Sequence, residues 1–546
     1  MLRLLTVSFL VVFLLGCNAN KISRSDIRHA QKIFGIEFTA NQIKTMQDYL
    51  NRNREGYDSM RADPVGYDVV PAMLFDPFPI GFEMPKEGKV SFQLNESVKL
   101  PEHLNELAYF SVADLSVLIK TKQITSVALT QFFLDRIKQY DSQLEAVITL
   151  LEDRALQQAR QMDEELAAGK YRGLLHGIPY GTKDLMAVAG YKTTWGAEPY
   201  KDQVIDATAT VIEQLDEAGA VLIAKLVSGA LARGDVWFGG KTKNPWDLDQ
   251  GASGSSAGSG SATSAGLVPF ALGTETLGSI TSPSTRNGIT GLRPTYGSVS
   301  RAGVMSLSWS MDKIGPMCRT VQDCAIVYDV IRGKDPLDPM STEAPFGYSD
   351  NGQVSRLKIG YFKELFVDDT TATGKNNQIM LDSLRSLGYE LLEAKMPESL
   401  SRKAYDIILR AEAGAFFDQL VVEKGDRKMV QQESFSRANS LRQSRFIPAV
   451  EYLQANRHRR LLIEDFHKVI SQFDVILTPT FGGSQLIVTN LTGHPVLAIP
   501  SGFDKDNHPT SISVLGNLYE EGKILEFGKM LQNQFDHHLK HPPGFE

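Results

Sequence analysis

The sequence predicts an α/β protein with a mostly buried, mixed β-sheet. Short apolar runs of the length typical of buried strands alternate with longer amphipathic stretches typical of helices. The predicted strands are Ala220–Lys225, Leu267–Leu272, Leu357–Phe362, Val475–Thr478, Val496–Ile499 and Ser511–Leu515. The 546 residues are 42% apolar and 22% charged, which is an ordinary globular composition. A chain of this length can therefore bury a large core.

The first seventeen residues have the pattern of a targeting segment. Arg3 gives a short positive region, and Leu4–Leu15 is almost wholly apolar but too short to span a bilayer comfortably. The sequence Leu-Leu-Gly-Cys that ends at Cys17 resembles the cleavage box of bacterial lipoproteins. We therefore expect a signal peptide over residues 1–16, a lipid anchor at Cys17 and a location in the bacterial cell envelope. An ordinary signal peptide with a chance cysteine is the alternative.

The next segment, residues 17–101, is predicted to be a lipid-attached tether and an N-terminal arm. Lys32–Asn53 has helical character, and Tyr67–Phe82 is rich in Pro, Phe and Tyr, as expected of an extended arm. Residues 102–546 form the predicted main domain. It begins with helices, the first of which has its capping box at Ser111.

A second capping box at Thr320 predicts a helix that ends at Gly333. Cys324 lies on this helix, six residues after Cys318. That spacing matches neither a CxxC redox pair nor a metal site, so we expect two free thiols in the core.

The composition argues against several functions. The formal net charge is −7, and no run of Lys and Arg suggests nucleic-acid binding. The glycine-rich stretch lacks the GK[ST] of a phosphate-binding loop, and the ten histidines form no HExxH motif. We therefore expect no metal, no cofactor and no nucleic-acid partner.

The stretch Gly251–Ser284 is the most informative part of the chain. Two loops rich in Ser and Gly flank the apolar run Leu267–Leu272, so a buried strand would bring the loops together. Backbone N–H groups at Gly278 and Ser279 could hold a developing oxyanion. Upstream, Lys183 follows a Gly-Ile-Pro turn in an apolar context, where burial would lower its pKa and make it a base. This combination predicts a serine hydrolase.

Five segments resemble the amidase signature family in order and spacing: GIPYGTKD, GSSAGS, GTETLGSITSP, GLRPTYGSVSRAGV and SMDKIGPMCRT. The resemblance implies a large central sheet sandwiched by helices, with residues 102–546 as the amidase domain. It also implies hydrolysis of carboxamide C–N bonds through an acyl-enzyme and a Ser–Ser–Lys triad, without a metal or cofactor. A small or peptide-like amide would be the substrate.

The residues of this chain match the family's triad one by one. Lys183 matches the buried lysine, Ser255 matches the bridging serine that follows a cis peptide bond, and Ser279 matches the nucleophile. The backbone of Thr276, Leu277 and Gly278 matches the loop that binds the oxyanion. Two positions depart from the pattern: Leu277 stands where the family usually has glycine, and Thr281 stands where it usually has arginine.

Three other interpretations compete with an envelope amidase. Gly254–Gly258 also matches GxSxG, the nucleophile elbow of α/β-hydrolases, in which Ser256 would be the nucleophile with Asp474 and His494 downstream. The polar segment before it lacks the strand that an elbow needs. A second alternative is a catalytically inactive binding lipoprotein on the amidase fold, which the departures at Leu277 and Thr281 would support.

The third alternative is the A subunit of glutamyl-tRNA amidotransferase, which belongs to the same family. It works in the cytoplasm with a partner subunit, so the predicted lipoprotein signal opposes it. For the substrate, the aromatic residues Trp195 and Trp309 near the motifs favour an amide with a hydrophobic acyl or amine part. The sequence predicts no oligomeric state.

Overall fold

The computed structural model describes residues 21–63, 65–69, 71–350, 354–367, 369–397 and 402–546. The predicted signal peptide and Cys17 lie outside these residues. The described chain falls into two compact units. One consists of residues 21–69 with Phe446–Val450, and the other of residues 71–445 with residues 451–546. The predicted domain boundaries stay a prediction.

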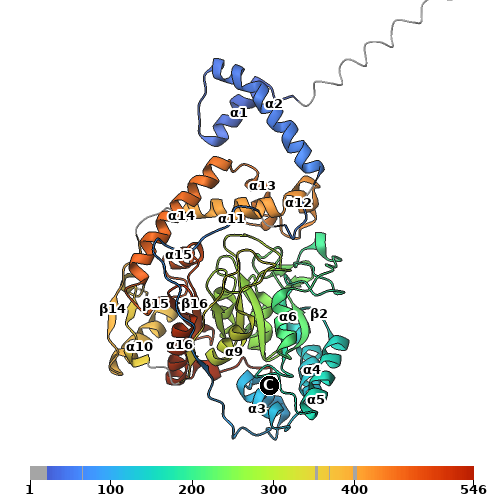
Figure 1. Ribbon diagram of the computed structural model, residues 1–546, viewed down its shortest axis with the longest axis vertical. Helices are drawn as coiled ribbons and strands as arrows, with labels where there is room; N and C mark the ends of the chain where they lie inside the picture. Colours follow the sequence, from blue (N-terminus) through green and yellow to red (C-terminus); the bar gives the residue numbers. More distant parts are fainter. Residues whose placement is uncertain (1–20, 64, 70, 351–353, 368, 398–401) are drawn as a thin grey trace, which may run out of the picture. The chain divides into compact units, whose positions relative to one another are not determined.

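The larger unit is built on a mixed sheet that has eleven strands among the described residues, in the order β14-β13-β15-β17-β16-β10-β11-β9-β3-β4-β2 (Figure 1). The strands are β2 (Val147–Leu150), β3 (Pro179–Lys183), β4 (Val221–Leu226), β9 (Phe270–Glu275), β10 (Thr290–Arg293), β11 (Lys313–Cys318), β13 (Ile359–Tyr361), β14 (Leu391–Glu393), β15 (Val475–Pro479), β16 (Val496–Phe503) and β17 (Pro509–Gly516). The pairs β3–β4, β3–β9, β13–β14 and β13–β15 are parallel, and the others are antiparallel. The predicted α/β class is confirmed.

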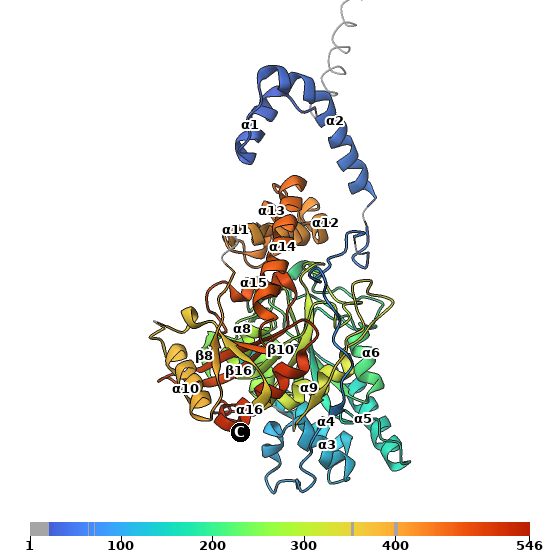
Figure 2. The same ribbon diagram turned by 60° about the vertical axis from the view of Figure 1, so that its left-hand side comes forward.

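The chain after residue 102 also forms helices, several of which cover the two faces of this sheet. They are α3 (Val112–Lys120), α4 (Ser126–Leu144), α5 (Glu152–Ala167), α6 (Thr210–Glu217), α7 (Ala257–Ser264), α8 (Thr281–Asn287), α9 (Val321–Ile331), α10 (Ala372–Ser386), α11 (Arg402–Phe416), α12 (Asp418–Val422), α13 (Arg437–Ser444), α14 (Ala449–Ile470), α15 (Gln485–Thr492) and α16 (Glu521–Phe535). Figures 1 and 2 show α10 beside the β14 end of the sheet and α4 and α5 beside the β2 end.

The strand register shows how the two faces are divided. In β10 and β16, Leu292 pairs with Leu497, and the neighbouring Gly291 pairs with Ala498. Successive residues of a strand point to opposite faces. Leu497 lies against Gly528 of α16, whereas Gly291 lies against Ser284 of α8. The sheet is therefore sandwiched between a layer that contains α16 and a layer that contains α8, as the family resemblance implied.

The capping predictions are confirmed. Ser111 caps α3 by accepting from the backbone N–H of Asp114, and Thr320 caps α9 by accepting from that of Asp323. Cys318 and Cys324 are buried free thiols, as expected.

The predicted strand Leu267–Leu272 is displaced. The strand β9 is Phe270–Glu275, and the Ser/Gly-rich segment before it forms the helix α7 instead of a loop. Helix propensity in this segment is low, but tertiary packing overrides it. A Cβ at Gly258 would lie 2.3 Å from the carbonyl oxygen of Ala146 and from the amide nitrogen of Val227, so the small residues let α7 sit directly on its neighbours.

The smaller unit contains two helices, α1 (Arg24–Phe34) and α2 (Ala40–Ala62). The helical stretch predicted over Lys32–Asn53 is interrupted, because Gly35 ends α1 in the left-handed conformation with φ of +64° and Thr39 caps α2. Each helix buries one residue, Ile27 and Ile43 respectively. Among the described residues, no helix has the length and apolar character needed to cross a membrane.

Candidate active site

Lys183 ends strand β3, which lies between β9 and β4 in the sheet, and is fully buried. Its ammonium nitrogen lies 2.8 Å from the hydroxyl of Ser255, 3.1 Å from that of Ser256 and 2.8 Å from that of Thr274 on the neighbouring strand β9. No carboxylate pairs with it among the described residues. The Lys183 nitrogen is therefore surrounded by three hydroxyl groups. It also has a longer contact, of 3.4 Å, with the carbonyl oxygen of Thr274.

Burial lowers the pKa of Lys183 from its usual 10.5 to about 7, while the more distant carboxylates of Asp312 and Glu275 act to raise it. A lysine with this pKa is substantially neutral at neutral pH. It can then accept a proton from a hydroxyl within hydrogen-bond distance. Ser255 is such a group.

Ser255 follows a cis peptide bond from Gly254, as the resemblance implied. The bond lies in a tight loop: Ser253 has a φ of +62°, and its backbone N–H donates to the carboxylate of Asp235 at 3.1 Å. A Cβ at Gly254 would lie 1.9 Å from the carbonyl oxygen of Gly234, so only glycine fits there. This loop directs the Ser255 hydroxyl to Lys183.

Ser279 lies in the connection between β9 and α8. It is 9% exposed, whereas Ser255 is 1% exposed, so Ser279 is the triad candidate nearest to solvent. The backbone N–H of Ser256 donates to the carbonyl oxygen of Ser279 at 3.2 Å, which ties the two serine loops together. The structure thus brings all three predicted triad residues into one region.

The loop before Ser279, which is the predicted oxyanion loop, contains a left-handed glycine. Gly278 has a φ of +79°, a conformation that favours glycine, and a Cβ there would lie 3.2 Å from Leu486 of α15. The hydroxyl of Thr276 donates to Asp312 at 2.5 Å. Leu277 is 40% exposed, so the leucine that replaces the usual glycine does not fill the loop.

A buried carboxylate that the sequence analysis missed supports the segment after Ser279. One oxygen of Glu275 accepts from the backbone N–H groups of Ile280 at 2.9 Å and Thr281 at 3.0 Å. The other oxygen forms an ion pair with Arg293 at 2.8 Å and accepts from Asn490 at 2.9 Å. Burial raises the pKa of Glu275, but Arg293 and the hydrogen bonds outweigh it and lower the pKa to about 2. The charged form is therefore the stable one.

Thr281, which departs from the family pattern, contacts this carboxylate as well. On the other side of the carboxylate, Arg293 of β10 is fully buried beside Glu275. The hydroxyl of Thr281 lies 3.2 Å from the same carboxylate. Glu275 lies three residues beyond the predicted strand Leu267–Leu272, so the displaced strand boundary concealed that this acidic residue is buried at the end of β9.

The elbow interpretation is not supported by the geometry. Ser256 has its hydroxyl engaged with Lys183 and with the backbone of Thr274. Asp474 binds the Lys358 backbone and Lys523, and His494 binds Thr492. No hydrogen bond joins Ser256, Asp474 and His494 in the described part of the chain. The polar segment before the elbow does contain a short hairpin, β7 (Lys243–Asn244) and β8 (Asp247–Gly251), which the sequence analysis did not expect.

The two predicted pocket tryptophans lie in one aromatic cluster. The ring centroids of Trp195 and Trp309 lie 6.0 and 5.9 Å from that of Phe416 in α11. Trp195 is 1% exposed, so it belongs to the core beside the site rather than to an open surface. That these residues contact a substrate stays a prediction.

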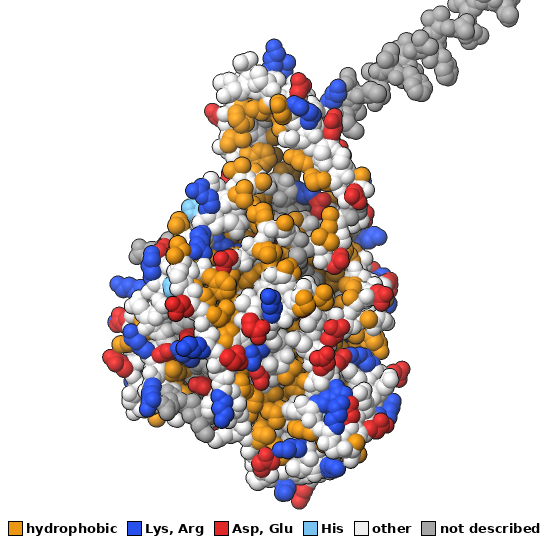
Figure 3. Space-filling view, in the orientation of Figure 1, with side chains coloured by type: hydrophobic (Ala, Val, Ile, Leu, Met, Phe, Trp, Pro, Cys, Tyr) orange, Lys and Arg blue, Asp and Glu red, His pale blue; other side chains and the backbone are white. Residues whose placement is uncertain are grey.

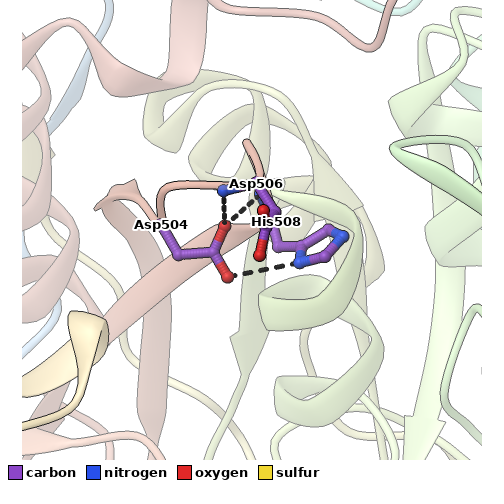
Figure 4. A group of neighbouring side chains, drawn as sticks. All are labelled: Asp504, Asp506 and His508. Carbon is purple, nitrogen blue, oxygen red and sulfur yellow. Dashed lines mark hydrogen bonds and ion pairs between the residues drawn. The ribbon is translucent and has the colours of Figure 1, made fainter.

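A group of metal-binding residue types occurs elsewhere, in the turn between β16 and β17. Figure 4 shows Asp504, Asp506 and His508 gathered at this turn. The carboxylate of Asp504 accepts from the backbone of Asp506 at 2.8 Å and of His508 at 2.9 Å, and the His508 ring lies 3.2 Å from the carboxylates of both Asp504 and Asp247. These interactions explain why the three side chains lie close together: they stabilise the turn between β16 and β17.

Comparisons with known proteins agree with the fold. The family model Amidase matches residues 128–486. The A subunit of glutamyl-tRNA(Gln) amidotransferase from Carboxydothermus hydrogenoformans is 33% identical over 487 residues, which are 80% of this chain and 99% of that protein. The same subunit from Neisseria meningitidis serogroup C (strain 053442) is 32% identical over 483 residues, 80% of this chain and 100% of that protein.

Two solved structures are also similar. Native peptide amidase from Stenotrophomonas maltophilia has a TM-score of 0.73 and 28% identity, covering 81% of this chain and 100% of that one. The corresponding glutamyl-tRNA(Gln) amidotransferase subunit from Thermotoga maritima has a TM-score of 0.67 and 25% identity, covering 84% and 100%.

These relatives correct one prediction. They are A subunits of glutamyl-tRNA(Gln) amidotransferase, the alternative that the predicted lipoprotein signal opposed, and they match 80% of this chain. By this comparison the prediction of a lipid-anchored protein in the bacterial cell envelope is wrong. The similarity outweighs a short apolar N-terminal pattern because it extends over most of the chain.

Proposed function

Because this chain belongs to the amidase family, whose members hydrolyse the C–N bonds of amides, we propose that it is a serine amidase that uses Ser279, Ser255 and Lys183 as its triad. The observation that carries the proposal is the 2.8 Å contact between the buried Lys183 nitrogen and the Ser255 hydroxyl. A buried lysine that faces only hydroxyls and carbonyl oxygen is suited to accept a proton, not to anchor an anion.

The proposed reaction begins when neutral Lys183 accepts a proton from Ser255, while Ser255 accepts one from Ser279. The Ser279 oxygen attacks the amide carbonyl, and the oxyanion is stabilised by backbone N–H groups of the Thr276–Ser279 loop. The proton then returns through Ser255 to the leaving amine, the C–N bond breaks, and an acyl-enzyme remains. Water hydrolyses the acyl-enzyme by the same proton relay.

A second candidate function is the amide-hydrolysing component of an amidotransferase. The similarity that favours it extends over 99% of the Carboxydothermus hydrogenoformans protein at 33% identity. In that case the chain would work with a partner subunit, and glutamine would be the amide. Release of ammonia from glutamine by the isolated chain, measured beside simple carboxamides, distinguishes the two functions.

Labelling with a fluorophosphonate probe, followed by peptide mass spectrometry, tests the triad. We expect the adduct on Ser279 and its loss in Lys183→Ala, while Lys192→Ala, whose amine is exposed and paired with Asp202, should label as the wild type does. An adduct on Ser256 would instead indicate the nucleophile elbow. Folded protein without any adduct would favour the inactive binding protein.

A further inference from the structure

A tight turn, Gly229–Asp235, packs directly on the loop that carries Ser255. The backbone N–H of Gly229 donates to the carbonyl oxygen of Ser255 at 3.1 Å. At the other end of the turn, the carbonyl oxygen of Gly234 lies so close to Gly254 that a Cβ at Gly254 would be only 1.9 Å from it. The carboxylate of Asp235 accepts a hydrogen bond from the backbone N–H of Ser253. The residues between these contacts therefore lie at the edge of the candidate active site.

The backbone of this turn is held in an uncommon conformation. Leu231 and Ala232 have φ values of +49° and +58°, and Gly234 has +60°. Two left-handed residues other than glycine persist only when their surroundings fix them. Arg437 of α13 provides this support, since its buried guanidinium donates to the carbonyl oxygens of Leu231 at 3.0 Å and Ala232 at 3.1 Å. The next residue, Arg233, therefore has a backbone whose position is fixed by this turn.

Arg233 is the exposed member of a group of three arginines. Arg437 is occupied by the turn, and Arg410 of α11 is paired with Asp406. No ion pair or side-chain hydrogen bond is formed by the Arg233 guanidinium with the described residues. Partial burial of its side chain lowers the pKa of Arg233, and the nearby charge of Arg410 lowers it further while Asp406 opposes this. The positive charge is thus in excess at this edge.

We propose that Arg233 is a specificity-determining residue that binds an anionic group, such as a carboxylate, on the substrate amide. This proposal rests on the serine amidase function proposed above and names its substrate class. A guanidinium pairs well with a carboxylate because both are planar and can form two parallel hydrogen bonds. A rigid turn fixes the base of the side chain before the substrate arrives, which reduces the entropy cost of binding.

This inference changes the substrate expected from composition alone. Trp195 and Trp309 suggested a hydrophobic acyl or amine part, but the cluster that they form with Phe416 lies largely in the core. Arg233 is exposed, so an anionic group can approach it from solvent. We therefore expect carboxylate-bearing amides to be hydrolysed better than alkyl amides of equal length.

Matched pairs of primary amides test this expectation. Succinamate, glutaramate and adipamate carry a carboxylate, and butanamide, pentanamide and hexanamide have the same numbers of carbon atoms without it. In the wild type, kcat/KM should favour the carboxylate member of at least one pair by about tenfold or more, and added NaCl should reduce this ratio. The ratio should approach one in Arg233→Met and be partly retained in Arg233→Lys.

Arg457→Met is the matched control, because Arg457 is an exposed arginine of α14 whose side chain hydrogen-bonds, among the described residues, only to Gln454. It should keep the wild-type ratio. The proposal is overturned if Arg233→Met also keeps it, or if the wild type prefers the alkyl amide in every pair.

A second measurement separates failure of this proposal from failure of the amidase function. If no amide is hydrolysed, the amidase function fails, and Arg233 is tested by protection. Succinate, glutarate or adipate should then slow fluorophosphonate labelling of the wild type but not of Arg233→Met. Equal labelling rates with and without all three dicarboxylates would reject Arg233 as an anion-binding residue.

Discussion

Lys183 shows how burial can convert an ordinary lysine into a base. Its nitrogen is surrounded by the hydroxyls of Ser255, Ser256 and Thr274, and full burial brings its pKa to about 7. Loss of hydration on burial has the largest effect on this pKa and exceeds the opposing effect of the carboxylates of Asp312 and Glu275. The departures at Leu277 and Thr281 leave this environment intact.

The first prediction concerns pH. The lowered pKa of Lys183 means that the protonated, inactive form dominates below about pH 7 and the neutral base above it. We therefore expect kcat/KM to rise with pH through a midpoint near 7. Lys183→Met should lower kcat/KM by about 10³-fold, and steady-state kinetics between pH 5 and 9 measures both effects.

Asp312→Asn provides a sharper form of this test. The carboxylate of Asp312 raises the pKa of Lys183, so its removal should move the midpoint to lower pH, whatever it does to kcat. A midpoint that stays in place or moves upward would contradict the assignment of the pH dependence to Lys183. Circular dichroism checks that the variant is folded.

At the scale of single elements, Glu275 connects β9 to the start of α8. It binds the backbone N–H groups that follow Ser279 and is neutralised by Arg293 of β10. Because both side chains are fully buried, the pair must be complete to be stable. The position of the proposed nucleophile, Ser279, thus depends on residues of β9, of β10 and of the start of α8.

The second prediction follows from this burial. Arg293→Met leaves the Glu275 charge without its partner, so the free energy of unfolding should fall by about 3–5 kcal/mol. Arg385→Met removes one partner of an exposed pair with Asp382, and its effect should stay within about 1 kcal/mol. Urea denaturation measures both variants.

The double variant Thr281→Arg with Arg293→Met moves the positive charge to the position that the family usually occupies. It should recover part of the lost stability and of kcat, because Glu275 regains a cation. If neither quantity recovers, Glu275 requires its cation at position 293, and a cation at position 281 does not replace it.

For the whole molecule, the separation into two compact units has a functional consequence. All residues proposed for catalysis and the three largest hydrophobic clusters lie in the unit formed by residues 71–445 and 451–546. In the smaller unit, α1 and α2 bury one residue each. The larger unit therefore has its own core.

On the face seen in Figure 3, basic and acidic side chains are interspersed.

The third prediction is that a chain lacking residues 1–69 folds and remains active. Its kcat/KM for a simple carboxamide should lie within about threefold of the full chain, since no proposed catalytic group is removed. Its thermal unfolding should remain cooperative, as expected of a compact unit that keeps all of its large hydrophobic clusters. Loss of the cooperative transition would show that the larger unit requires the smaller one.

The sequence by itself determined the fold class and the candidate triad. Lys183, Ser255 and Ser279 stand in ordered motifs, and local rules sufficed for the caps at Ser111 and Thr320, because a cap depends on residues three positions apart. Such features are local in the chain and can be read without knowing what packs against them.

Only the tertiary structure decided the features that join distant segments. The Gly/Ser-rich segment 257–264 is a helix because its neighbours leave room for nothing larger than its small residues. Arg293 neutralises Glu275 eighteen residues away in the chain, and Arg437 fixes the turn that presents Arg233 from 204 residues away. These partners have no fixed spacing in the sequence, because close packing and the neutralisation of buried charge depend on distance in space.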